Sequence, residues 1–248
     1  MTLPFELESD RGQAMGLIVL QTDELMEYEL GKLFLGQGLR TYQNRIPCMP
    51  EVRPETLSMM GESMTASAAM LPDEAGISVI GYGCTSGATI LGEARVTELI
   101  NHAHPRVAVT NPLSALKAAC KELGVNKLGL VSPYIAEVTD ALKAAIETTG
   151  IQISAYGSFE QAEDQTVARI SPKSTKNAMC EIGSGECDAV FASCTNLRAW
   201  EIIPEAEKHL GKPVLCSNQV LGWHMLRLAG LNAPVAAAGR LFDYGLGG

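Results

Sequence analysis

The feature that most constrains the fold of this chain is a strict alternation between apolar runs of strand length and segments with helical spacing. The runs that resemble strands are residues 15–21, 39–47, 76–82, 106–111, 126–132, 151–159, 187–193 and 212–218. A segment with helical periodicity follows each run. Alternation of this kind predicts an α/β fold with parallel sheets.

The expected helices span 23–38, 53–71, 87–103, 112–124, 133–150, 171–185, 197–211 and 219–231. Several begin at a proline, which suits the first helical turn, and the seventh is expected to break or restart at Pro204. In the second helix Met59, Met60, Met64 and Met70 are spaced along one face. That spacing predicts packing in the core or in a subunit interface.

The order of elements also repeats once along the chain. The stretch "GYGCTSGATILGEARV" occupies the same place in the first series that "FASCTNLRAWEIIPEA" occupies in the second, with Cys84 and Cys194 at equivalent positions. We therefore predict two halves related by a pseudo-twofold axis, each a roughly four-stranded parallel sheet flanked by helices. The expected halves are 1–111 with 219–248, and 112–218.

Both cysteines follow a predicted strand directly. Ligands of open parallel sheets bind at the carboxyl ends of the strands. A pseudo-twofold axis would bring Cys84 and Cys194 face to face across one cleft between the halves, the predicted active site. The residues that follow them, Thr85 and Ser86 in the first half and Thr195 and Asn196 in the second, offer short hydrogen-bonding groups to a substrate.

Two facing thiols can act as acid and base without a cofactor. One thiolate can remove a proton from a carbon acid while the other thiol protonates the opposite face, which inverts a stereocentre. Alternatively, one thiolate can add to an activated C=C bond and allow cis–trans isomerisation after bond rotation. We interpret the remaining cysteines as small buried hydrophobic residues: Cys48, Cys120, Cys180, Cys187 and Cys216.

Composition excludes several classes of function. A formal net charge of −9 argues against nucleic acid, and the absence of a long apolar run argues against a membrane span. Seven cysteines without a CxxC pair predict neither a disulfide framework nor a zinc site, which favours a reducing cytoplasm. No Gly-rich dinucleotide motif or P-loop follows a strand, so no nucleotide cofactor is expected.

The pair "GCTSG" and "SCTNL" resembles the Asp/Glu racemase superfamily, in particular its maleate isomerase and arylmalonate decarboxylase branch. "SCTNLRAWEIIPEAEKHLGKPVLCSNQ" is the most specific stretch, and "EDQTVARISP" and "VSPYIAEV" are similar to further segments of the branch. The resemblance implies a cofactor-independent enzyme, a homodimer or higher homo-oligomer, and a pocket lined by Tyr134. It also implies that Thr85 and Thr195 help to hold a substrate carboxylate.

The chain departs from the branch in ways that bear on the substrate. The decarboxylases have only the second cysteine, so the presence of Cys84 favours isomerase or racemase chemistry. Asp23 and Gln165 stand where maleate isomerases carry carboxylate-binding asparagines. An acid at position 23 would repel a dianion, which favours a substrate with one carboxylate and an amine or acylamine. The alternative for Asp23 is a helix cap.

The opening "GLIVLQTDE" resembles the ectoine-utilisation group of the superfamily, which points to the breakdown of ectoine. We therefore expect a two-cysteine racemase that acts on a small amino or acylamino carboxylate. The alternatives are maleate cis–trans isomerisation by thiolate addition, arylmalonate-type decarboxylation, and non-catalytic binding of a metabolite. A cysteine hydrolase is disfavoured because no histidine lies in a predicted pocket turn. We expect Asn111 to cap a helix and His224 to be packed.

Overall fold

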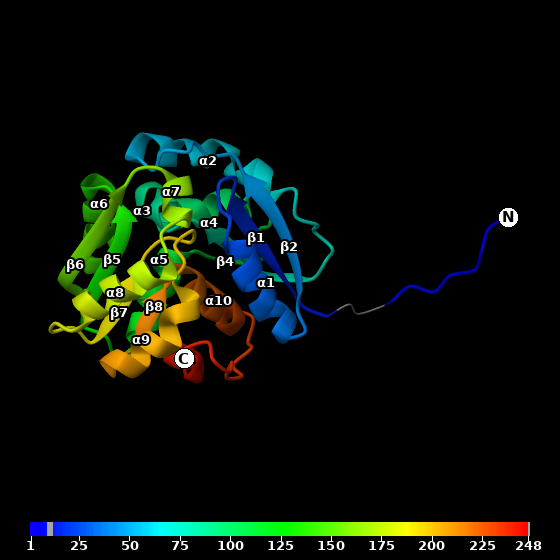
Figure 1. Cartoon of the computed structure of the whole chain (residues 1–248). Coiled ribbons are helices and arrows are strands. Elements are labelled where there is room, and N and C mark those ends of the chain that lie inside the picture. The colour runs from blue at the N-terminus through cyan, green and yellow to red at the C-terminus, as the bar shows by residue number, and fades with distance from the viewer. Residues whose placement is uncertain (9–11, 248) are drawn as a thin grey trace.

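The protein, described here from a computed structural model over residues 1–8 and 12–247, contains two parallel sheets of four strands each (Figure 1). The first has the order β2-β1-β3-β4 and the second the order β6-β5-β7-β8. The strands are β1 (Ala14–Leu20), β2 (Arg40–Ile46), β3 (Ile77–Gly83), β4 (Ala108–Thr110), β5 (Lys127–Tyr134), β6 (Gln152–Gln161), β7 (Ala189–Ala192) and β8 (Val214–Cys216). The identical order confirms the repeat and the predicted fold class.

Burial explains why these runs form strands. Every residue of β1 and of β7 is buried, as expected of a strand covered by helices on both faces. The edge strand β2 is instead mostly half-exposed and polar, with the sequence RTYQNRI. The most apolar runs therefore occupy the interior of each sheet, and their ends fix the position of the cleft.

Helices connect and flank the strands: α1 (Met26–Gly36), α2 (Pro54–Ala68), α3 (Thr85–Leu91), α4 (Glu93–Asn101), α5 (Pro112–Leu123), α6 (Ala136–Glu147), α7 (Asp164–Ala168), α8 (Pro172–Gly183), α9 (Ile203–Leu210) and α10 (Ser217–Leu228). Two 3₁₀ turns, η1 (Trp200–Ile202) and η2 (Arg240–Asp243), complete the set. The predicted proline starts at Pro54, Pro112 and Pro172 are confirmed. Asn111 caps α5 as expected, accepting hydrogen bonds from the N–H groups of Leu113 and Ser114.

Two expected helices differ from the prediction, and a third restarts beside its proline as expected. The helix over 87–103 divides into α3 and α4 at Gly92, whose φ of 87° lies outside the helical region. The helix expected from Pro133 begins at Ala136, because β5 continues through Tyr134. The segment after Cys194 forms a turn and η1 before α9 begins at Ile203, next to Pro204.

The methionine face of α2 is only partly confirmed. Met60 and Met64 are buried, whereas Met59 and Met70 are 54% and 73% exposed. The exposed pair therefore does not fill the core of this chain.

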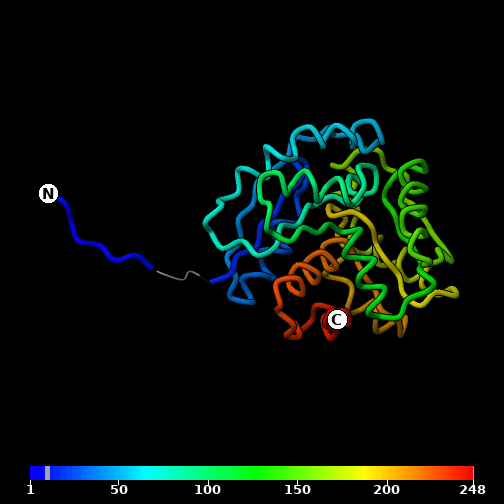
Figure 2. The backbone as a smooth tube through the Cα atoms, turned by 180° about the vertical axis from the view of Figure 1, so that it is seen from behind, coloured from blue at the N-terminus to red at the C-terminus, as the bar shows by residue number. Residues whose placement is uncertain are grey.

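The last helix links the two series of elements. Helix α10 follows β8 in sequence but packs on β3 and on α5 and α1. Seen from behind in Figure 2, the earlier part of the chain (blue to cyan) and the later part (green to yellow) lie side by side, with α10 between them. The division at residues 111 and 219 remains a prediction with which this packing agrees. In the described part of the chain, no helix is both long and apolar enough to span a bilayer.

Candidate functional site

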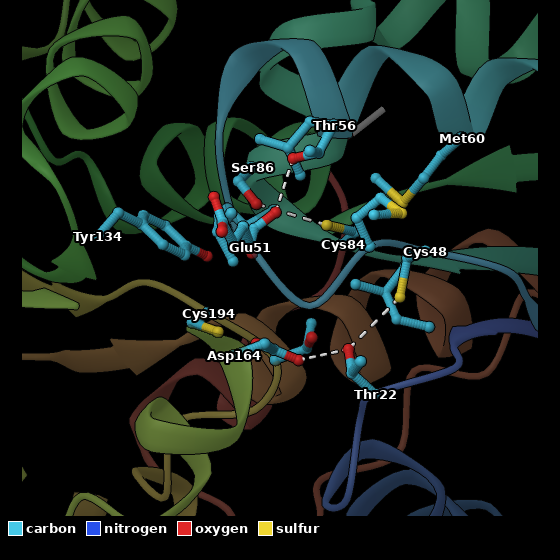
Figure 3. A pocket seen from close by; sticks show the side chains of 16 residues that line it. Thr22, Cys48, Glu51, Thr56, Met60, Cys84, Ser86, Tyr134, Asp164 and Cys194 are labelled. Carbon is cyan, nitrogen blue, oxygen red and sulfur yellow. Dashed lines mark hydrogen bonds between the residues drawn. The ribbon is translucent and has the colours of Figure 1, made fainter. Parts of the chain in front are cut away.

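The carboxyl ends of β3 and β7 open onto one cavity between the two halves (Figure 3). Cys84 and Cys194 line it from different strand ends, and the Tyr134 ring, at the end of β5, lies beside them. The cysteine side chains are nearly buried, with only 4% and 6% of their surface exposed. The structure thus brings the two thiols predicted from the repeat into one cavity.

Cys84 is held by the start of α3. It is the residue that precedes the helix, and its Sγ accepts a hydrogen bond from the Gly87 N–H at 3.1 Å. The Ser86 hydroxyl lies 3.5 Å from the same sulfur. The thiol therefore sits in a fixed place, held by one backbone donor and one neighbouring hydroxyl.

Cys194 is held by a strained turn. Its φ of 100° is in the region that favours glycine, and its Sγ accepts a hydrogen bond from the Asn196 N–H at 3.4 Å. The Cys194 N–H donates to the Ser217 hydroxyl at 3.0 Å, which anchors the turn to α10. A non-glycine residue in this conformation costs about 1–3 kcal/mol, so the surrounding contacts must fix the thiol in place.

Burial sets the protonation of both thiols. It raises the pKa of Cys84 to about 12, against the opposing hydrogen bonds of Ser86 and Gly87. Burial likewise raises the pKa of Cys194 well above its usual range, and the negative charge of Asp164 adds to the effect. Both thiols are therefore neutral at pH 7 in the ligand-free protein. A reaction through a thiolate requires that substrate binding lower the pKa of one of them.

The two threonines beside the cysteines connect the walls of the cleft. The Thr85 hydroxyl lies 2.8 Å from that of Ser217, which itself holds the Cys194 N–H. The Thr195 hydroxyl donates to the Gly83 carbonyl, next to Cys84, at 3.3 Å. Both threonines line the cavity as predicted, but their hydroxyls also lock the two cysteine turns to each other.

Asp164 is a cavity residue that the sequence analysis missed. It begins α7, is 5% exposed, and lines the cavity together with both thiols. Its Oδ2 accepts hydrogen bonds from the Thr22 hydroxyl at 2.6 Å and from Asn196 Nδ2 at 3.0 Å. Burial raises the pKa of this carboxyl, and the hydrogen bonds from Thr22 and Asn196 oppose that effect.

Asn196 was predicted to bind substrate, and the structure gives its side chain another task. Its Nδ2 holds Asp164, and its Oδ1 accepts a hydrogen bond from the Glu24 N–H at 2.9 Å. With both ends of the amide engaged, Asn196 positions the acid and the loop after β1.

The structure places Asp23 and Gln165 outside the thiol cavity. Both border a neighbouring open depression, and Gln165 is exposed because its neighbour Asp164 takes the inward position on α7. Asp23 Oδ1 accepts hydrogen bonds from the N–H groups of Leu25 and Met26, so this carboxyl satisfies backbone donors at the start of α1, although the residue that directly precedes the helix is Leu25. Burial raises the pKa of this carboxyl, and its Oδ2 has no hydrogen-bond partner among the described residues.

Cys48 was interpreted as a buried core residue, and the structure corrects this. It is half-buried and lines the cavity, with its sulfur 3.4 Å from the Thr22 hydroxyl. It belongs to a segment, residues 47–52, that crosses from the first half to the second. No sequence signal marked this residue, because it follows an edge strand without a polar turn motif.

Residues 47–52 cover the cleft like a lid. The Val52 N–H donates to the Ala162 carbonyl at 2.7 Å, and the Asp164 N–H donates to the Pro50 carbonyl at 3.1 Å. The remaining cavity has a volume of about 20 Å³, enough for about one water molecule. We therefore expect this segment to move when a substrate enters.

The cavity has no cationic lining. Within the described residues, no Lys, Arg or His lines it, and no group of three His, Cys, Asp or Glu side chains is arranged to hold a metal ion. Among the side chains that line the cavity, neutral hydroxyls, such as those of Ser86 and Tyr134, and the thiols are the groups that can donate to an anion. The site can accept a small polar molecule between two thiols, with a carboxyl group on one wall.

Comparison with known proteins places this site in context. The profile of the arylmalonate decarboxylase family matches residues 16–242. A maleate isomerase from Alcaligenes faecalis is 25% identical over 243 residues, covering 92% of this chain and 96% of the relative. One from Nocardia farcinica is 26% identical over 238 residues, with coverages of 92% and 94%. The solved structure of the Nocardia farcinica maleate cis-trans isomerase bound to Tris has a TM-score of 0.82 and 25% identity, covering 93% of this chain and 97% of that one.

Proposed function

This chain belongs to the arylmalonate decarboxylase family, and we propose that within it the protein is a cofactor-independent isomerase that acts on a small carboxylate through Cys84 and Cys194. One observation carries the proposal: two buried thiols from equivalent strand ends line the same small cavity. Two such groups can deliver and remove a proton on different sides of a bound molecule.

Cis–trans isomerisation is the reaction best supported by the relatives, which are maleate isomerases over nearly the whole chain. After one thiol has released its proton to solvent, its sulfur adds as a thiolate to one carbon of an activated C=C bond, and the other thiol protonates the adjacent carbon. The new single bond rotates. The second sulfur then takes the proton back as the C–S bond breaks, which restores both groups and releases the isomer.

Stereoinversion of a carbon acid is the second candidate, and the carboxyl group of Asp164 favours it. A substrate with one carboxylate and an amino or acylamino group would place its nitrogen beside that acid. One sulfur, present as a thiolate after its proton has passed to solvent, would take the α-proton, and the other thiol would protonate the opposite face. A role in ectoine breakdown, a cytoplasmic location and a homo-oligomeric state remain predictions of the sequence.

Proton NMR in D₂O tests the proposal, with maleate, both enantiomers of aspartate and both enantiomers of Nα-acetyl-2,4-diaminobutyrate as substrates. We expect conversion or α-proton exchange to fall by about 10²–10⁴-fold in Cys84→Ser and in Cys194→Ser. Cys180→Ser is the matched control, because that thiol lies on α8 outside the cavity. Circular dichroism should show the same fold in all four proteins.

The products separate the two reactions. Fumarate formed from maleate indicates thiolate addition, whereas loss of the α-proton together with loss of optical activity indicates stereoinversion. Release of CO₂ from an arylmalonate that needs only Cys194 would instead indicate decarboxylation. Binding of a ligand that neither serine variant weakens, without any turnover, would contradict the enzyme proposal and favour a metabolite-binding protein.

A further inference from the structure

We propose that Asp164 determines substrate specificity: it selects a molecule that carries one carboxylate together with an ammonium or amide N–H group, and it disfavours a dicarboxylate. This inference rests on the proposed function, since it concerns the same cavity and the same two thiols. It differs from the expectation based on Asp23, because the Asp23 carboxyl accepts hydrogen bonds from N–H groups at the start of α1 and does not line the cavity.

The position of Asp164 leaves one oxygen available to a ligand. Both of its side-chain hydrogen bonds, from Thr22 and Asn196, go to Oδ2, and no described residue donates a hydrogen bond to Oδ1. Figure 3 shows the carboxyl between Cys194 and Thr22. Two donors on one oxygen suit an ionised carboxylate, which is an acceptor only.

Among the described residues, no cationic side chain lines the cavity to compensate for this charge. Glu51, the other acid of the lining, is exposed and paired with Arg53 Nε at 2.8 Å, so that cation is already engaged at the rim. The donors deeper in the cavity are neutral hydroxyls. A single substrate carboxylate can be held by such groups, but a second one beside Asp164 would meet a like charge in a place shielded from water.

A substrate N–H group is attracted to the Asp164 carboxylate, whereas a second substrate carboxylate is repelled by it. An ammonium or amide can donate to the available oxygen of Asp164 and makes a charge-assisted hydrogen bond there. Asn196 and Thr22 fix the carboxyl from behind, so its position does not depend on the ligand. Asp164 therefore discriminates between a nitrogen and a carboxylate at one end of the substrate.

Maleate and its monoamide, maleamate, form an isosteric pair that tests this directly. Asp164→Asn is the isosteric change on the protein side, and its amide oxygen can still accept from Thr22. We expect the wild type to favour maleamate over maleate by at least about tenfold in affinity or kcat/KM, since like-charge contacts are costly. In Asp164→Asn this preference should fall by at least about tenfold. Isothermal titration calorimetry and proton NMR supply the two measurements.

Glu24→Gln is the matched control. Glu24 carries the same charge as Asp164 and lies in the loop between β1 and α1. It is exposed and pairs with Arg169 outside the cavity. Removing its charge should change the preference for maleamate less than about threefold. An equal effect of the two variants would mean that net charge, and not the local contact of Asp164, sets the preference.

The remaining outcomes separate this inference from the proposed function. A wild type that binds maleate as tightly as maleamate, or that binds neither, overturns the role of Asp164. Thiol-dependent turnover would still support the isomerase in that case. Conversely, a preference that shifts in Asp164→Asn without any turnover in the wild type would support the role of Asp164 and contradict the isomerase.

Discussion

Gly87 lies where the turn of Cys84 packs closely against other side chains. A Cβ added at this position would meet the hydroxyl of Tyr82, lie 2.7 Å from Met60 Cε, and lie 3.0 Å from the sulfur of Cys84. Tyr82 is fully buried and cannot swing away. The donor that holds the thiol therefore comes from a residue that has no room for a side chain.

We predict that Gly87→Ala lowers the free energy of unfolding by about 1–3 kcal/mol, because overpacking a closed site displaces its neighbours. It should also lower turnover at least about tenfold by moving the Cys84 sulfur. Chemical denaturation and the NMR assay check both effects. Gly31→Ala is the control: it lies within α1 with no atom near its Cβ, so alanine should be neutral or stabilise by about 0.5–1 kcal/mol. Equal effects of the two substitutions would contradict the steric explanation.

On α7, a difference of one position decides which residue faces the cavity. Sequence analysis selected Gln165 as the cavity residue, whereas Asp164 occupies that place and Gln165 is exposed. A helix of five residues has too little periodicity to indicate which side faces inward. Cys84 and Cys194 were identified from the sequence because the repeat marks them twice, while Asp164 has no such counterpart.

At the scale of elements, α10 and β4 are joined by one polar contact. His224 Nδ1 lies 2.8 Å from the hydroxyl of Thr110, the last residue of β4. Burial lowers the pKa of this histidine to about 4. The imidazole is therefore neutral in the folded protein throughout the physiological range, as expected of a packed histidine.

This contact predicts a loss of stability in mild acid. Between the usual histidine pKa near 6.5 and the folded value of about 4, the unfolded chain binds a proton that the folded protein does not. Stability should therefore fall as the pH falls through this window, by at most about 1.4 kcal/mol per pH unit from this group. His224→Gln should have a shallower dependence, which denaturation at pH 7, 6 and 5 would reveal. Parallel pH curves for the two proteins would contradict the assignment.

Some boundaries of helices and strands are set by local sequence, and others by contacts with distant segments. Proline marked the starts of α2, α5 and α8 correctly, because its fixed φ acts locally. At Pro133 the same rule failed, since pairing with β6 extends β5 through Tyr134. That extension carries the Tyr134 side chain into the cavity instead of onto a helix.

At the scale of the whole molecule, the closed cleft requires a motion. Residues 47–52 join the second half through the hydrogen bonds of Val52 with Ala162 and of Asp164 with Pro50. A cavity with room for about one water molecule cannot admit a dicarboxylate or its amide. We therefore predict that this lid opens before binding, as in many enzymes whose loops enclose the substrate.

Hydrogen exchange would detect this opening. Without ligand, we expect the amides of Val52 and Asp164 to exchange at least about 100-fold faster than that of Ile18 in β1, which belongs to the buried core. Saturating maleamate should slow the first two and leave Ile18 unchanged. Equal protection of all three amides in the free protein would contradict an independently moving lid.

The sequence by itself determined the architecture and the position of the two thiols. Apolar runs, helical spacing and the repeated order are local signals, and they were sufficient to predict the two four-stranded sheets with Cys84 and Cys194 at equivalent strand ends. Tertiary structure alone decided which further residues reach the cavity and how its walls are joined. Asp164 and Cys48 reach it, and Thr85 and Thr195 lock its walls, through contacts between residues more than 100 positions apart or on loops without periodicity. Such contacts depend on how the two halves meet, which no local pattern encodes.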